Sequence, residues 1–175
     1  MNASAWLAWF GLVGVAASAQ TSAPPAKPCT GAEHRQFDFW IGDWDVFNPK
    51  GEPAGRNLIR PAMGGCVLHE QWAGKGGFSG ESFNAWDASR GRWHQTWVDA
   101  SGGVLLLDGV FANSSMTLSD RDVTGKKDAN LVNEIAWTPN ADGSVRQHWR
   151  VSKDGGKSWT TSFDGKYVRS ARPQP

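Results

Sequence analysis

From Gly42 onward, short segments of alternating apolar and polar residues are separated by turn sequences at close, regular intervals. The turns hold the Gly, Asn, Asp and Pro residues that tight turns require, as in PKGEP, GKGG, NADGS and DGGK. No connection is long enough for the crossover helix that a parallel strand pair needs, so consecutive strands should pair antiparallel. We expect ten strands, near residues 43–47, 56–61, 66–73, 79–87, 92–99, 104–111, 115–121, 131–138, 145–152 and 158–169.

A meander of about ten strands leaves two unpaired edges unless its first and last strands pair with each other. Such pairing closes the sheet into a barrel. The sequence therefore predicts an all-β fold, an antiparallel up-and-down meander closed into a barrel over residues 37–170. A linker and N-terminal segment should occupy residues 20–36, with one short helical turn between Gly31 and Phe39, and a tail should occupy residues 171–175.

The first nineteen residues have the pattern of a secretory signal peptide. Trp6 to Ala17 is an apolar run, and Ala17-Ser18-Ala19 matches a small-residue cleavage site. The segment before the run lacks Lys and Arg, which leaves open that the true start codon lies elsewhere. A membrane anchor is the alternative, although the run is shorter than the ~20 residues of a spanning helix. We predict a periplasmic or secreted protein without a membrane span after signal removal.

Two cysteines, Cys29 and Cys66, remain to be explained. In an oxidising compartment an even pair indicates a disulfide, which would tie the segment before the first strand to the third strand. Closing a loop of that length stabilises a fold by roughly 3–4 kcal/mol in the chain-entropy model. Two unpaired thiols are the alternative. A metal site is not expected, because neither cysteine has a His or Cys at ligand spacing.

Alternation also assigns the residues of each strand to the two faces of the sheet. The chain holds eleven Trp residues against a single Tyr, and most of them fall on one face. Because Trp rings bury a large area, the Trp face is the predicted inner face. Its members are Cys66, Leu68, Glu70 and Trp72; Ser82, Asn84 and Trp86; Trp93, Gln95, Trp97 and Asp99; Leu131, Asn133, Ile135 and Trp137; Val145, Gln147, Trp149 and Val151; and Trp159, Thr161 and Phe163.

The same face carries several polar residues, and an unpaired buried polar group costs roughly 1–3 kcal/mol. They indicate a hydrogen-bonded core network or a wet pocket, unless some lie at the barrel rims. Trp rings interleaved with amides are typical of a site for a small hydrophobic or aromatic molecule. The predicted ligand-binding residues are Glu70, Trp72, Asn84, Trp86, Gln95, Trp97, Trp137, Gln147 and Trp149. The leading hypothesis is therefore an exported small-molecule-binding protein.

Two other classes of function stay open. A small enzyme could use a barrel carboxylate, Glu70 or Asp99, as an acid or base, because an aromatic pocket raises the pKa of a carboxyl. Paired carboxylates also invite a glycosidase interpretation, but the sequence does not place these two within reach of each other. A nucleophilic serine is not indicated, since the chain lacks a G-x-S-x-G elbow. The third class is a structural envelope protein with a filled core.

Haem, metal and nucleic acid are not expected as partners, and no cofactor is predicted. His69, His94 and His148 alternate away from the Trp face, whereas a haem-binding barrel needs an inward histidine as axial ligand. The net charge is +1 and the sequence shows no basic stripe, so nucleic-acid binding is not indicated.

The segment from Phe37 to Trp44, FDFWIGDW, contains a G-x-W tripeptide at the head of the first strand. This resembles the opening signature of calycin barrels, the lipocalin and fatty-acid-binding superfamily. The resemblance implies that the glycine lets the chain enter the barrel tightly and that Trp44 closes the barrel floor as part of the core.

A longer pattern runs through most of the chain, from about residue 29 to 167. It comprises FDFWIGDWDV, GGCVLHEQW, GESFNAWD, WHQTWVD, DGSVRQHWRVSKDGGKSW and FDGKY. Together these segments resemble an uncharacterised family of secreted bacterial proteins. The resemblance implies a calycin-like barrel and brings no established activity.

The segment from Ser152 to Trp159, SKDGGKSW, resembles the Asp-box of sialidases and other β proteins. A sialidase propeller would repeat this box, whereas this chain has one copy and is too short for six blades. We therefore interpret the segment as a hairpin turn shaped by its Asp and Gly residues, with Trp159 packed beneath it.

Overall fold

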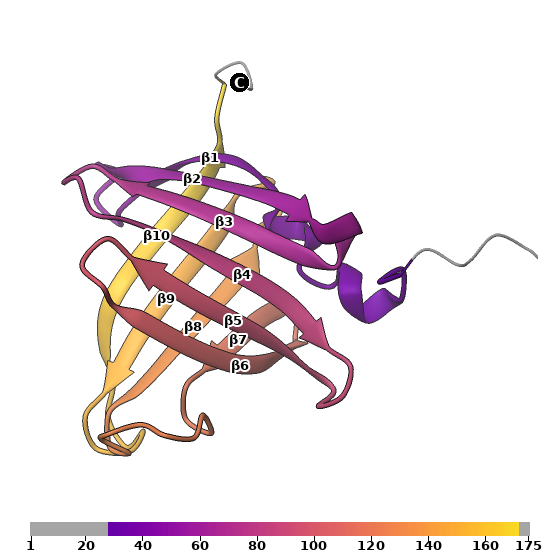
Figure 1. Cartoon of the computed structure of the whole chain (residues 1–175). Coiled ribbons are helices and arrows are strands. Elements are labelled where there is room, and N and C mark those ends of the chain that lie inside the picture. Colours follow the sequence, from indigo (N-terminus) through magenta and orange to yellow (C-terminus); the bar gives the residue numbers. More distant parts are fainter. Residues whose placement is uncertain (1–27, 172–175) are drawn as a thin grey trace, which may run out of the picture.

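Ten antiparallel strands close into a barrel in the computed structural model, which describes residues 28–171 of the chain (Figure 1). Each strand pairs with the next, and β1 pairs with β10 from Trp44↔Arg169 to Phe47↔Lys166. The predicted all-β meander and its closure are thus confirmed. The strands are β1 (Gly42–Phe47), β2 (Pro53–Ala62), β3 (Val67–Gly74), β4 (Ser79–Asp87), β5 (Arg92–Asp99), β6 (Val104–Ala112), β7 (Ser115–Ser119), β8 (Val132–Pro139), β9 (Val145–Ser152) and β10 (Thr160–Arg169).

Strand β2 begins at Pro53, three residues earlier than expected, and two smaller differences at other strand ends have local causes. Strand β7 ends at Ser119, two residues early, because the carboxylate of Asp120 turns to accept the backbone N–H of Asn133 (2.8 Å). Strand β10 begins at Thr160, because Ser158 is still held in the preceding turn. The predicted signal peptide at residues 1–19 lies outside the described residues.

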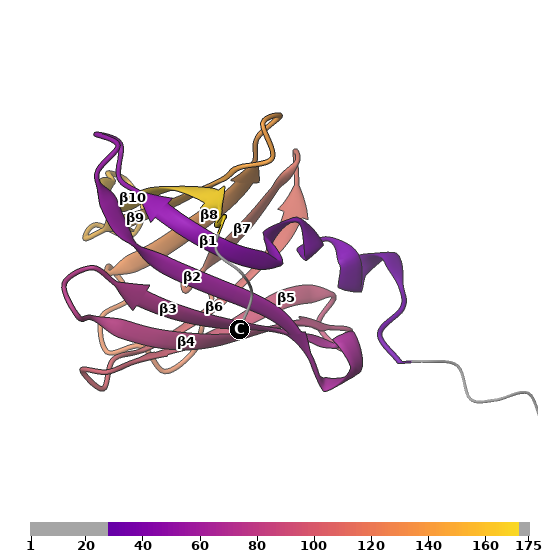
Figure 2. The ribbon, with the colours of Figure 1, turned by 90° about the horizontal axis from the view of Figure 1, so that it is seen from above.

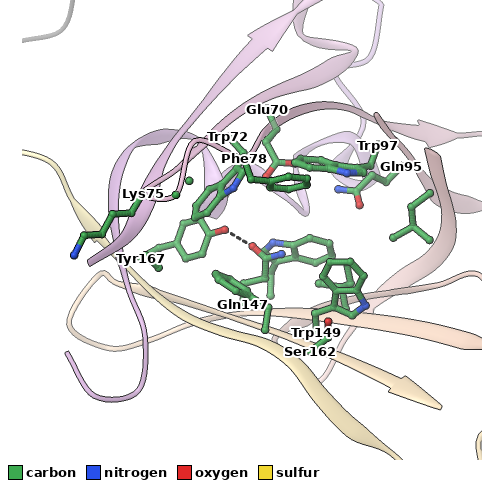
Figure 3. Close-up of a pocket in the computed structure, with 17 residues that line it drawn as sticks. Glu70, Trp72, Lys75, Phe78, Gln95, Trp97, Gln147, Trp149, Ser162 and Tyr167 are labelled. Atoms are coloured by element: carbon green, nitrogen blue, oxygen red, sulfur yellow. Dashed lines mark hydrogen bonds between the residues drawn. The ribbon is translucent and has the colours of Figure 1, made fainter. Parts of the chain in front are cut away.

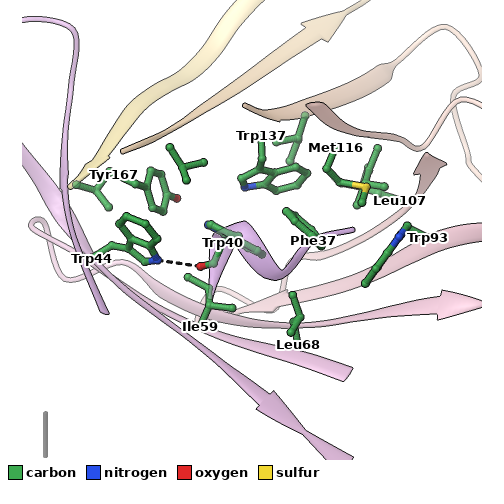
Figure 4. Packing of buried hydrophobic residues seen from close by; sticks show 14 residues of the cluster. Phe37, Trp40, Trp44, Ile59, Leu68, Trp93, Leu107, Met116, Trp137 and Tyr167 are labelled. Atoms are coloured by element: carbon green, nitrogen blue, oxygen red, sulfur yellow. Dashed lines mark hydrogen bonds between the residues drawn. The ribbon is translucent and has the colours of Figure 1, made fainter. Parts of the chain in front are cut away.

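Two short 3-10 helices, η1 (Ala32–Arg35) and η2 (Asp38–Trp40), lie across one end of the barrel (Figure 2). They occupy the segment where one helical turn was expected. Phe37 and Trp40 are fully buried there and stack on each other at 4.8 Å between ring centroids. Phe37 also meets Trp93 edge-on at 5.6 Å, and Trp137 at 5.3 Å (Figure 4). We call this aromatic cluster, with the helices that cover it, the closed end.

The G-x-W tripeptide lies where β1 leaves the closed end. Trp44 is fully buried, and its Nε1 donates a hydrogen bond to the backbone oxygen of Trp40 (2.9 Å). The guanidinium of Arg169 lies 4.0 Å above the Trp44 ring and donates to the backbone oxygen of Ile41. A Cβ on Gly42 would come within 1.9 Å of Nη1 of Arg169, so only glycine leaves room for this contact. Trp44 thus fills the barrel floor, as expected.

A disulfide joins Cys29 to Cys66, as predicted. It links the segment that precedes η1 to the residue just before β3, 37 positions later. Arg35 reinforces the same connection by donating to the backbone oxygen of Gly65. The helices of the closed end are therefore anchored covalently to the barrel wall. Within residues 28–171, no helix has the length and apolar character needed to cross a membrane.

The segment with the Asp-box pattern forms the hairpin between β9 and β10. One carboxylate oxygen of Asp154 accepts the backbone N–H groups of Lys157 (3.0 Å) and Ser158 (2.8 Å). Trp159 packs under the guanidinium of Arg150, 4.3 Å from the ring centroid. Arg150 points outward, so the placement of Trp159 on the inner face is wrong.

The inner-face assignment also fails at two other positions near strand starts. The register of β10 shifts between Thr161 and Phe163, so Thr161 turns outward and bonds to His148 (3.0 Å) while Phe163 stays inside. Leu131 precedes β8 and is exposed. A bulge or a strand that starts one residue later breaks the strict period of two on which the assignment relied.

Candidate ligand-binding cavity

A cavity of about 350 Å³ occupies the part of the barrel interior that the closed end does not fill (Figure 3). Its wall comes from strands on all sides of the barrel and from the β3–β4 turn. The lining residues are Ala54, Glu70, Trp72, Gly74, Lys75, Gly76, Phe78, Gln95, Trp97, Leu105, Ile135, Trp137, Gln147, Trp149, Ser162, Phe163 and Tyr167.

The Trp side chains leave the centre of the cavity open because two of their rings pack over glycines on neighbouring strands. Gly55 on β2 faces Trp72, and a Cβ there would come within 2.7 Å of the ring. Gly80 on β4 faces Trp97 in the same way, at 2.3 Å. A larger residue at either glycine would push the ring inward. The hollow interior therefore depends on these Trp–Gly pairs.

Glu70 on β3 is the centre of a polar network on one side of the cavity. Nδ2 of Asn57 donates to its Oε1 (2.6 Å), and the hydroxyl of Ser82 donates to its Oε2 (2.5 Å). Glu70 is only 4% exposed and has no ion-pair partner among residues 28–171. Burial therefore raises the pKa of the Glu70 carboxyl above its ordinary value, although the bonds from Ser82 and Asn57 oppose the rise.

The network continues along β4 and β5 through buried amides. Nδ2 of Asn84 donates to the hydroxyl of Ser82 (2.8 Å), and Nε2 of Gln95 donates to Oδ1 of Asn84 (2.7 Å). Asn84 lies behind this chain of bonds, whereas Gln95 reaches the cavity. Oε1 of Gln95 makes no hydrogen bond within the described residues, so it can accept one from an occupant.

On the opposite side the network reaches β9 and β10. Nδ2 of Asn57 also contacts the hydroxyl of Tyr167 (3.3 Å), and that hydroxyl donates to Oε1 of Gln147 (Figure 3). Burial, together with the nearby Glu70 carboxyl, raises the pKa of Tyr167 well above 10. Tyr167 therefore stays a neutral donor, and Nε2 of Gln147 has no partner within the described residues.

The structure brings most of the sequence-predicted binding residues to this cavity. Those that line it are Glu70, Trp72, Gln95, Trp97, Trp137, Gln147 and Trp149. Two do not: Asn84 supports the network from behind, and Trp86 packs against the aromatic core. The structure gives the positions of these residues, and their role in binding stays a prediction.

The remaining inward polar residues serve local structure. Asp99 does not line the cavity, and its Oδ1 accepts from the hydroxyl of Ser101 (2.5 Å) and from the backbone N–H of Gly103 (3.1 Å). These bonds hold the pKa of Asp99 below its ordinary value. Asn133 accepts the indole N–H of Trp149 (3.0 Å) and so orients that ring. Glu70 and Asp99 are thus not presented together to an occupant.

The binding residues predicted from the sequence do not include several residues that line the cavity, namely Tyr167, Leu105, Phe78 and Ser162. Tyr167 and Leu105 follow the same alternation as the residues that were found, so extending the pattern along β10 and β6 would have indicated them. Phe78 lies in a turn and Ser162 in the bulge of β10, where alternation carries no information.

His69, His94 and His148 point outward, as predicted. His69 bonds to Glu81 (2.6 Å) and stacks on Phe83, and His94 bonds to Asp108 (2.8 Å). The described part of the chain contains no group of three or more His, Cys, Asp or Glu residues arranged to hold a metal ion.

A comparison of the chain with protein-family models finds no match, and a comparison with curated proteins finds none either.

Proposed function

We propose that this protein binds a small organic molecule with an aromatic or apolar body inside the barrel. The observation that carries the proposal is the cavity itself, with Trp72, Trp97 and Trp149 on its walls and the Glu70 network on one side. Small-molecule sites are typically concave, about 300–1,000 Å³ in volume, and apolar with a few convergent polar groups. A filled structural barrel, the third class of function, is less well supported because the interior is hollow.

The proposed compartment is the periplasm or the exterior of the cell. The disulfide supports it, because disulfides persist in oxidising compartments, and residues 1–19 carry a signal pattern. The G-x-W tripeptide at the head of β1 and the closed antiparallel barrel likewise support a calycin-like relationship.

The test is a titration with small aromatic compounds, followed by NMR of the Trp indole N–H signals. Binding should move the signals of Trp72, Trp97 and Trp149, while those of Trp40 and Trp44 at the closed end should hardly change. Perturbation spread evenly over all the signals, or none for any compound, would count against the proposal.

A matched pair of variants localises the effect. Leu105→Trp places a second large ring inside the cavity, whereas Val104→Trp places the same ring at the adjacent position on the outer face, which is 65% exposed. The first should abolish binding and the second should leave it unchanged. Both variants must first show wild-type circular dichroism.

One observation favours an enzyme as the second candidate. Glu70 lines the cavity with a raised pKa, which suits a carboxyl that gives and takes a proton. Asp99 offers no second carboxyl there, so a two-carboxylate glycosidase is not proposed. Mass spectrometry of a bound compound after incubation decides between the two: unchanged recovery indicates binding, and Glu70-dependent conversion indicates catalysis.

A further inference from the structure

We propose that the cavity selects ligands with a cationic head, such as a primary or quaternary amine on an aromatic body, and that Glu70 pairs with this head. The inference rests on the proposed binding function and names the chemical class of its ligand.

The first argument is that the Glu70 carboxyl has no positively charged partner in the cavity within the described part of the chain. Among residues 28–171, Glu70 is the only carboxyl that lines the cavity, and no Arg or His of this part of the chain lines it with Glu70. Lys75 does line the rim, but it is exposed and its ammonium points away from the interior (Figure 3). A buried carboxylate without a cation is costly, and an occupant that carries the positive charge removes that cost.

The geometry of the Glu70 carboxyl leaves room for such a partner. Oε1 accepts one hydrogen bond, from Asn57, and Oε2 accepts one, from Ser82, whereas an ionised carboxylate has about four acceptor positions. The two donors fix the orientation of the carboxyl and leave acceptor positions for an ammonium. Oε1 of Gln95 supplies a further acceptor nearby on the same network.

The walls point to the same class of ligand. Trp72, Trp97, Trp149 and Phe163 line the cavity, and the faces of aromatic rings attract cations. Rings that surround a carboxyl form an environment in which an anionic head would meet repulsion from both. A carboxylate or phosphate ligand is therefore disfavoured.

Three probes that share a phenyl ring and differ in the charge of the head test this inference: 2-phenylethylamine, 2-phenylethanol and 3-phenylpropionate. Isothermal titration of the protein with each should rank the amine first, about tenfold or more above the alcohol, with the propionate weakest. An alcohol or a propionate that binds as tightly as the amine overturns the inference but supports the proposed function. If none of the three binds, both fail.

The variant Glu70→Gln keeps the shape of the side chain and removes its charge. It should lower the affinity for the amine about tenfold and so remove the preference for the amine over the alcohol. The matched control is Glu81→Gln, which removes the same charge from the outer face of the neighbouring strand and should change neither affinity. Unchanged amine binding by a folded Glu70→Gln variant overturns the inference. The wild-type ranking of the three probes stands on its own if that variant does not fold.

Discussion

Both ends of the barrel interior are built from Trp residues, but one end is filled and the other is hollow. At the closed end Trp40, Trp44 and Trp93 are almost fully buried, and Trp40 and Trp93 pack against Phe37. At the cavity end Trp72, Trp97 and Trp149 are only partly buried, and all three line the cavity. The same residue type therefore serves as core in one half and as a candidate binding wall in the other.

What lies opposite each ring explains the difference. At the closed end a segment from outside the sheet, with Phe37 and Trp40, fills the space between the strands. At the cavity end no equivalent segment of residues 28–171 enters, and Gly55 and Gly80 leave room for the rings of Trp72 and Trp97 to pack against the wall. Trp137 is the boundary, because it packs on Trp40 at 5.3 Å and also lines the cavity.

The largest expected effect comes from deleting one ring in each half. Trp40→Ala should lower the free energy of unfolding by about 3–5 kcal/mol, because it leaves a void in packed core. Trp97→Ala should cost less than about 2 kcal/mol, because its ring already borders empty space. Urea unfolding of both variants measures the difference. Equal losses would show that the cavity-end rings are core as well.

Removing the disulfide tests the difference between the closed end and the cavity end in a second way. The double variant Cys29→Ser/Cys66→Ser should lose roughly 3–4 kcal/mol of unfolding free energy, from the closure of a 37-residue separation. The loosening should be local to η1 and η2, which the disulfide anchors to β3. Amide hydrogen exchange should accelerate there and stay slow in β4 and β5. Uniform acceleration would contradict an independent closed end.

The barrel could be predicted from the sequence because short stretches of sequence determine its strands and their pairing. Turn residues between short alternating segments determine where each strand ends, and the absence of crossover-length connections determines how strands pair. The alternation also placed Glu70, Gln95 and Gln147 on the inner face, since a period of two holds within a regular strand.

Other features depend on contacts that a local pattern does not encode. Trp86 and Trp97 share the predicted inner face, yet only Trp97 lines the cavity, because the position of a residue along the barrel axis decides whether it meets the closed end. Trp159 follows a turn and Thr161 lies at a bulge, so their faces differ from the alternation. The hollow itself depends on cross-strand pairs such as Trp97 with Gly80, which join different segments of the chain.

The third prediction concerns the polar side of the cavity. Burial raises the pKa of Glu70 in the folded protein above its ordinary value of 4.5, so the folded state holds the proton more tightly than the unfolded chain. The stability that this group contributes is complete below that value and is lost as the pH rises through the folded pKa. Wild type should therefore lose stability relative to Glu70→Gln as the pH rises through the folded pKa.

Urea unfolding at a series of pH values measures that difference. The comparison with Glu70→Gln cancels the other groups whose ionisation affects stability. A difference between the two proteins that does not change with pH would show that the Glu70 carboxyl keeps an ordinary pKa. It would then be as well solvated as a surface carboxyl, and the cavity end would be wetter than its aromatic walls indicate.

The smallest effect on stability is expected at the mouth of the cavity. Phe78 lies in the β3–β4 turn, is 48% exposed and lines the cavity at its rim (Figure 3). Phe78→Ala should change the free energy of unfolding by no more than about 0.5 kcal/mol, because little packing is lost at an exposed site.

If the mouth admits a ligand, the same change should weaken binding of an aromatic amine several-fold, mainly through faster dissociation. Val110→Ala, at a 50% exposed position on the outer face of β6, is the control and should alter neither quantity. A stability loss at Phe78 as large as that at Trp97 would mean that the rim belongs to the packed core, and the boundary between the filled and hollow halves would then lie further out along the barrel.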